Sequence, residues 1–172
     1  YDPTPGAQAK GTMVLLPGMF GTPDAIIHST IRRFRGSGWA VVRMLSHPGR
    51  FTQRATFEVD PSNLDAAGAG IARVFNQRTA EVAYSVEAAV EYAHTLRPGL
   101  ESKRHVLLGM SGGAMALPTV YARNPGLYDA AILIAGGANF LRINMDSNYV
   151  RWIDSVELAW TEGTAPRSDD QG

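Results

Sequence analysis

The stretch HVLLGMSGGAMALP, residues 105–118, decides how this chain is interpreted. An apolar run typical of a buried strand is followed directly by a segment compatible with a helix, and residues 109–113 at the junction form a G-x-S-x-G pattern. At such a turn Ser111 must adopt a strained backbone conformation to project its hydroxyl, and small neighbours such as Gly109 and Gly113 let strand and helix approach closely. Two interpretations remain open. Ser111 is a nucleophile, or the segment is a glycine-rich loop that binds a phosphate or simply turns.

Strand and helix patterns alternate along the rest of the chain. Strands are expected at 12–16, 39–45, 105–110 and 130–137, and a long turn-rich connection at 46–63. Helices are expected at 23–35, 112–123 and 145–160, and a further helical region follows the connection and is firmest at 79–97. This alternation predicts an α/β fold with a mostly parallel sheet and helices on both faces. Pro118 lies inside the helix that follows Ser111, where the missing N–H predicts a kink or a local irregularity.

Composition and charge exclude several classes of function. The 172 residues fit one domain, and the 16 basic and 16 acidic side chains balance, which argues against a nucleic-acid surface or a polyanionic substrate. The chain has no cysteine, which excludes disulfides, thiol catalysis and cysteine-ligated zinc. No apolar run reaches the roughly 18 residues of a membrane span. No histidine and carboxylate cluster has the spacing of metal ligands, so neither a metal nor another cofactor is expected.

The two ends of the sequence also carry expectations. The chain begins at Tyr1 rather than at a methionine, which favours removal of a leader and a periplasmic or secreted location over a cytoplasmic one. Residues 161–172 are polar and lack apolar periodicity, so they are expected to form a loop or tail of the kind where a chain is cut.

These segments resemble the α/β-hydrolase family over about residues 10–141, and the resemblance assigns roles to two loops. The segment LLPGMFGT, residues 15–22, is similar to the family's oxyanion loop, and GMSGG is similar to its nucleophile elbow. The resemblance implies that Ser111 is the nucleophile and that the backbone N–H groups of Met19 and Gly112 bind the oxyanion. It also implies that Phe20 walls the acyl pocket and that Met110 contacts the substrate.

One departure from the family lies in the oxyanion loop, and another concerns the catalytic partners of Ser111. Pro17 stands where the family often has a histidine, which leaves the backbone donor but removes that side chain's hydrogen bonds. The family's chain order is serine, then acid, then histidine, yet all four histidines precede Ser111. These are His28, His47, His94 and His105, of which only His47 is expected at the correct edge of the sheet. The carboxylates after Ser111, Asp146, Asp154 and Glu157, are expected to be solvent-facing charges on a helix.

The sequence therefore predicts half of an active site. The leading hypothesis is a serine hydrolase for a carboxylic ester or related acyl compound, whose histidine, and acid, come from outside residues 1–172. A second polypeptide, the C-terminal remainder of the same hydrolase, would complete both the sheet and the triad and cover an apolar edge. Residues 142–160 would form a helical lid-like or packing segment. The alternative is a non-catalytic hydrolase-like subunit that acts as a scaffold or binding module.

Overall fold

The computed structural model describes residues 1–18, 22–45, 54–137 and 156–161, and its contacts divide the chain into two compact units. The first unit consists of residues 1–47 and 79–136, and the second of residues 48–78 and 137–172. The first unit contains both motifs found in the sequence, residues 15–22 and 109–113.

A four-stranded parallel sheet forms the centre of the first unit. Its strands are β1 (Gly11–Leu16), β2 (Trp39–Arg43), β4 (Arg104–Met110) and β5 (Ala130–Ile134). Their order in the sheet is β2-β1-β4-β5, and all three pairings are parallel. All four strands were predicted from the sequence, because strands buried within a parallel sheet are short and almost entirely apolar.

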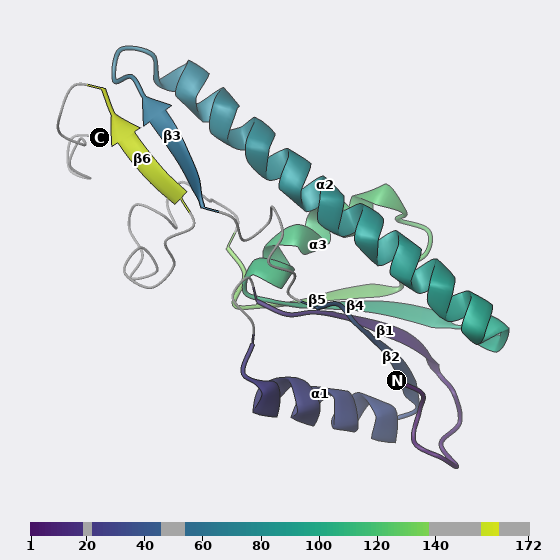
Figure 1. Cartoon of the computed structure of the whole chain (residues 1–172). Coiled ribbons are helices and arrows are strands. Elements are labelled where there is room, and N and C mark those ends of the chain that lie inside the picture. The colour runs from purple at the N-terminus through teal and green to yellow at the C-terminus, as the bar shows by residue number, and fades with distance from the viewer. Residues whose placement is uncertain (19–21, 46–53, 138–155, 162–172) are drawn as a thin grey trace. The chain divides into compact units, whose positions relative to one another are not determined.

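Helices cover both faces of this sheet. Helix α1 (Asp24–Gly36) connects β1 to β2, whereas α3 (Gly112–Arg123) connects β4 to β5 in the opposite direction across the sheet. Because such crossovers are right-handed, opposite directions put the two helices on opposite faces, as Figure 1 shows. The part of α2 (Leu64–Leu96) that belongs to the first unit pairs with α3 through the Arg123–Glu87 ion pair. The predicted α/β class with helices on both faces is confirmed.

The apolar core of the first unit follows the alternation of the strands. Ile27 and Ile31 of α1 pack on a buried cluster of strand residues, namely Met13, Leu15, Val41, Val106, Leu108 and Met110. The intervening residues Val14 and Leu107 point to the other face and are fully buried. Both faces of β1 and β4 are thus covered.

The edge strand β5 is covered far less. All five of its residues are exposed, although its sequence is AAILI, and the exposed fractions of Ile132, Leu133 and Ile134 are 40%, 54% and 44%. Successive side chains of a strand point to opposite faces, so β5 exposes apolar surface on both faces. Among the described residues, β5 pairs with a strand, β4, along only one edge.

Two helices can be compared in detail with the sequence prediction. Helix α2 (Leu64–Leu96) runs for 33 residues and occupies the helical region expected after residue 63. Helix α3 continues through Pro118, which lies at its exposed surface, so the predicted irregularity does not end the helix. Within the described ranges, no helix combines the length and the apolar character that a membrane span needs.

The second unit contains a parallel strand pair that the sequence analysis did not predict. Strand β3 (Ala55–Val59) lies in the expected connection 46–63, and it pairs with β6 (Val156–Trp160). The expectation of a helix is therefore wrong for residues 156–160. In VELAW the large apolar residues alternate with Glu157 and Ala159, and this period of two fits a strand, whereas the spacing of the tryptophans suggested a helix. The rest of the expected helix, residues 145–155, lies outside the described residues.

Candidate active site

The carboxyl ends of β1 and β4 lie side by side at the centre of the sheet. The chain leaves β1 toward β2 on one side, and it leaves β4 toward β5 on the other. In parallel α/β sheets, such a reversal opens a crevice beyond the strand ends, where ligands bind. The segment after Leu16 and the turn at Ser111 both lie at this reversal of the chain direction, so the two motifs found in the sequence lie at one place in the fold.

Ser111 has a backbone conformation that is rare for a residue with a side chain. It lies between the last residue of β4 and the first of α3, with φ 51° and ψ −119°. These angles match the first central position of a type II′ turn, which glycine usually occupies. The Ser111 N–H donates to the Ile134 carbonyl at 2.8 Å, and the Ser111 carbonyl accepts from the Met115 N–H at 3.2 Å. The strained serine expected from the sequence is therefore present, fixed by β5 on one side and α3 on the other.

The two glycines around Ser111 allow contacts that a side chain would prevent. A Cβ atom added to Gly109 would lie 2.7 Å from the backbone of Ala114, so strand and helix could not approach as they do. A Cβ atom on Gly113 would lie 2.3 Å from the Leu16 carbonyl oxygen and 2.5 Å from that of Pro17. The first turn of α3 therefore packs directly on the backbone at the end of β1. This contact brings the turn at Ser111 next to the start of the loop 17–22.

A hydrogen bond closes the loop after β1. The Gly18 N–H donates to the Thr22 hydroxyl at 3.0 Å, which draws together the two ends of a short segment. Met19 and Phe20 belong to that segment and lie outside the described residues, so their assigned roles stay predictions. The sequence analysis gave Thr22 no role, although a threonine hydroxyl close to a turn commonly bonds a nearby backbone group.

The residues on either side of Ser111 are both buried. Gly112 is the first residue of α3, where backbone N–H groups have no partner within the helix and the helix dipole favours negative charge. Met110 packs in the core cluster on the α1 face of the sheet. Its contact with a substrate stays a prediction, since the contacts found here are with the core.

A second strained residue lies beside Ser111 and was missed in the sequence. Ala135 has φ 51° and directly follows Ile134, which pairs with Met110 across the two strands. Ser111 and Ala135 are the only residues other than glycine with positive φ in the described ranges, and they occupy equivalent positions on neighbouring strands. Strained residues gather at functional sites, and the Gly-Gly pair after Ala135 was the available signal.

The histidines of the described ranges lie away from Ser111. His28 is exposed on α1, and His94 lies in the last turn of α2. His105 lies near the start of β4, and the five strand residues between it and Ser111 hold the two about 20 Å apart. His94 contacts His105 at this opposite edge of the sheet. His47 lies outside the described residues.

The candidate acids are placed only in part. Asp146 and Asp154 lie outside the described residues. Glu157 lies on β6 rather than on a helix, and its carboxylate accepts hydrogen bonds from Arg54 and Thr56, each at 3.1 Å. These contacts give Glu157 a structural role within the second unit.

Comparisons of the chain with known protein families, with curated proteins and with solved structures gave no match. Its function is therefore inferred from the residues and their geometry.

Proposed function

We propose that this chain is the nucleophile-bearing part of a serine hydrolase of the α/β-hydrolase type. The observation that carries the proposal is the backbone of Ser111, whose φ of 51° occurs at a strand-to-helix turn where the connections of the central sheet change direction. A loop that merely turned would use glycine there at no steric cost, and Gly112 and Gly113 follow immediately. A serine in this position indicates that the hydroxyl itself is needed.

The proposed reaction is acyl transfer from a carboxylic ester or related compound. The Ser111 Oγ attacks the carbonyl carbon while a base takes its proton, and the new Oγ–C bond forms as the carbonyl oxygen becomes an anion. The backbone N–H groups of Gly112 and Met19 stabilise that anion, together with the dipole of α3. The bond to the leaving group then breaks, the base protonates the leaving group, and water hydrolyses the acyl-enzyme. In related sites, loss of one oxyanion donor costs on the order of 3 kcal/mol of transition-state stabilisation.

The contact between α3 and the end of β1 supports the assignment of the oxyanion donors. Gly113 touches the carbonyl oxygens of Leu16 and Pro17, so the segment that contains Met19 begins beside the turn at Ser111. Two N–H donors from different loops can converge on one oxygen only if the loops are held together. A backbone contact that tolerates no Cβ atom meets this condition.

The proposed base is a histidine outside residues 1–172. His28, His94 and His105 lie elsewhere in the fold, as described above, and a base must lie within about 3 Å of the hydroxyl, or act through one water. His47 is the remaining candidate within the chain. The acid that orients the base is likewise proposed to come from outside.

The exposed edge at β5 supports a second polypeptide. Strands in parallel sheets are normally covered on both faces, and an uncovered apolar edge strand pairs readily with another strand. The backbone and the three large apolar side chains of β5 offer such an edge next to Ser111. We propose that the C-terminal remainder of the hydrolase adds a strand here and supplies the histidine.

The proposal is tested with a fluorophosphonate probe, which reacts with activated serines. The protein is purified with every polypeptide that co-purifies, and the 172-residue chain is prepared alone. We expect labelling of Ser111 in the assembly, no labelling of the chain alone, and none in S111A. Strong labelling of the chain alone would show that the base is within it, with H47Q as the variant that identifies it. An unlabelled assembly would favour the non-catalytic subunit.

A further inference from the structure

Two imidazoles meet at the end of the sheet opposite Ser111. His94 in the last turn of α2 and His105 on β4 bring their Nε2 atoms to 2.8 Å. Their rings are arranged edge to face, with centroids 4.9 Å apart and an angle of 75° between the planes. The exposed fraction of His105 is only 2%, whereas His94 is half-buried. The pair thus connects a helix to the central sheet through one hydrogen bond.

The direction of this hydrogen bond follows from the second nitrogen of His105. The backbone of Lys103 favours the protonated His105 ring, and since Nε2 faces His94, we assign this interaction to Nδ1. A backbone carbonyl only accepts, and a neutral imidazole has one N–H group. His105 Nε2 is therefore an acceptor in the neutral pair, and the N–H group of His94 Nε2 donates to it.

The contact tolerates one added proton but not two. With one extra proton, a single hydrogen still lies between the two Nε2 atoms, and the imidazolium donates to the neutral ring. With two, both Nε2 atoms carry hydrogens, no acceptor remains, and two positive charges lie at hydrogen-bond distance. The second protonation therefore replaces an attraction by a repulsion.

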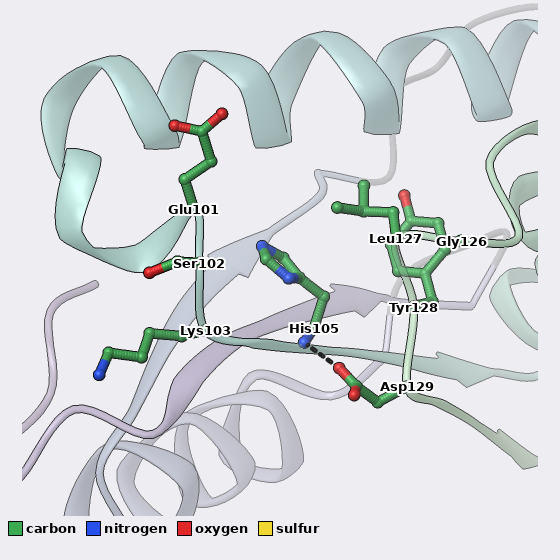
Figure 2. A pocket seen from close by; sticks show the side chains of 8 residues that line it. All are labelled: Glu101, Ser102, Lys103, His105, Gly126, Leu127, Tyr128 and Asp129. Atoms are coloured by element: carbon green, nitrogen blue, oxygen red, sulfur yellow. Dashed lines mark hydrogen bonds between the residues drawn. The ribbon is translucent and has the colours of Figure 1, made fainter.

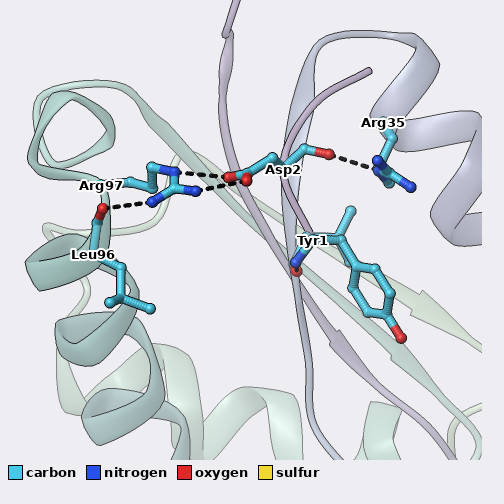
Figure 3. A network of polar contacts seen from close by, with 6 residues as sticks. Tyr1, Asp2, Arg35, Leu96 and Arg97 are labelled. Carbon is cyan, nitrogen blue, oxygen red and sulfur yellow. Dashed lines mark hydrogen bonds and ion pairs between the residues drawn. The ribbon is translucent and has the colours of Figure 1, made fainter. Parts of the chain in front are cut away.

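The charges around the pair come from three other segments. The Asp129 carboxylate precedes β5 and accepts the His105 backbone N–H at 2.8 Å, and Glu101 and Lys103 line the same cavity (Figure 2). Arg97, one turn after His94, is already paired with Asp2 at 2.7 and 2.9 Å (Figure 3). Asp129 is thus the carboxylate that partly offsets the positive charge of a protonated His105, and it already accepts a hydrogen bond from the His105 backbone.

We propose that the His94–His105 pair is a pH-sensitive latch, which holds the C-terminal end of α2 on β4 near neutral pH and opens when both rings are protonated. The proposal rests on the contact between the rings and is independent of the chemistry proposed for Ser111.

The pKa of His105 agrees with a latch that opens as the pH falls. Burial lowers the pKa of its imidazole below the ordinary 6.5, and His94 lowers it further, whereas Asp129 and the Lys103 backbone act in the opposite direction. Because the pKa of His105 is lower in the closed form than in the open form, the ring binds a proton more readily after the latch has opened. The stability of the closed form is therefore complete above the ordinary pKa and decreases as the pH falls below it, down to the lowered value.

Hydrogen exchange of the full chain tests the latch. We expect the exchange protection of residues 90–96, measured relative to that of α3, to fall by about tenfold between about pH 7.5 and pH 5. In H94Q the side-chain amide can donate to neutral His105 or accept from its protonated form, so the latch should stay closed and the pH dependence should become weaker, with only the part that comes from the burial of His105 left. The matched control H28Q, which removes an exposed histidine on α1, should keep the wild-type profile.

A second measurement decides the question even if H94Q does not fold. Nitrogen NMR of the wild-type His105 imidazole should show its pKa below the ordinary 6.5, and the protection of residues 90–96 should fall over the pH range in which that ring is protonated. An unchanged pH dependence of protection in folded H94Q would overturn the proposal. Protection that falls without protonation of His105 would overturn it as well.

Discussion

Replacing Ser111 with glycine is predicted to leave the fold more stable than replacing it with alanine. Both variants lack the hydroxyl, so the difference between their free energies of unfolding reports the cost of the Cβ atom at φ 51° and ψ −119°. A residue with a Cβ atom loses about 1–2 kcal/mol of stability in a left-handed conformation, and glycine avoids this loss. Glycine in turn loses about 0.5–1 kcal/mol, because its more flexible unfolded chain gives up more conformational entropy on folding. We therefore expect S111G to exceed S111A by about 1 kcal/mol in free energy of unfolding, roughly a fivefold change in the folding equilibrium.

Equilibrium urea denaturation measures this difference from the two midpoints, provided that the slopes agree. Ser85 is the matched control, because it lies exposed in the regular helix α2. There the order should reverse, with glycine about 1 kcal/mol less stable than alanine. If S111G were also the less stable variant at Ser111, the strained turn, and with it the argument for a nucleophile, would be refuted.

Three further perturbations follow from the contacts described above. G113A should destabilise the fold by about 1–3 kcal/mol in urea denaturation, because its Cβ meets backbone oxygens that cannot move aside, whereas G68A in open space on α2 should stabilise it by roughly 0.5–1 kcal/mol. D129N should lower the pKa of His105 further in an NMR titration, since it removes a negative charge but keeps an acceptor; an unchanged pKa would contradict the role given to that charge. L133E should reduce the concentration-dependent association of the chain with co-purifying polypeptides or with itself in sedimentation experiments, while its free energy of unfolding changes by less than about 0.5 kcal/mol. Equal association of wild type and variant would count against β5 as the interaction edge.

The central sheet could be predicted from the sequence because its signals are local. Buried parallel strands are short apolar runs, and Pro17 and Gly38 mark where such runs end or begin. The same holds for the turn at Ser111, whose flanking glycines are needed for contacts that the structure shows directly.

The features that were missed depend on partners distant in sequence. Strand β6 is stabilised by pairing with β3, about 100 residues earlier, so the helical spacing of its aromatic residues was misleading. The His94–His105 contact joins a helix to a strand, and neither position has a distinctive neighbourhood in sequence. The strained residue Ala135 lies beside Ser111 because β5 is next to β4, and only the strand order reveals this.

Trapping of the acyl-enzyme tests the central claim, that Ser111 is a nucleophile, most directly. The protein, with every polypeptide that co-purifies, is mixed with a p-nitrophenyl ester, quenched in acid and digested for mass spectrometry. We predict a burst of p-nitrophenol stoichiometric with the chain, and an acyl group on the peptide that contains Ser111, both absent in S111A. Ester turnover with the acyl group on another residue, or with an undiminished burst in S111A, would contradict the account.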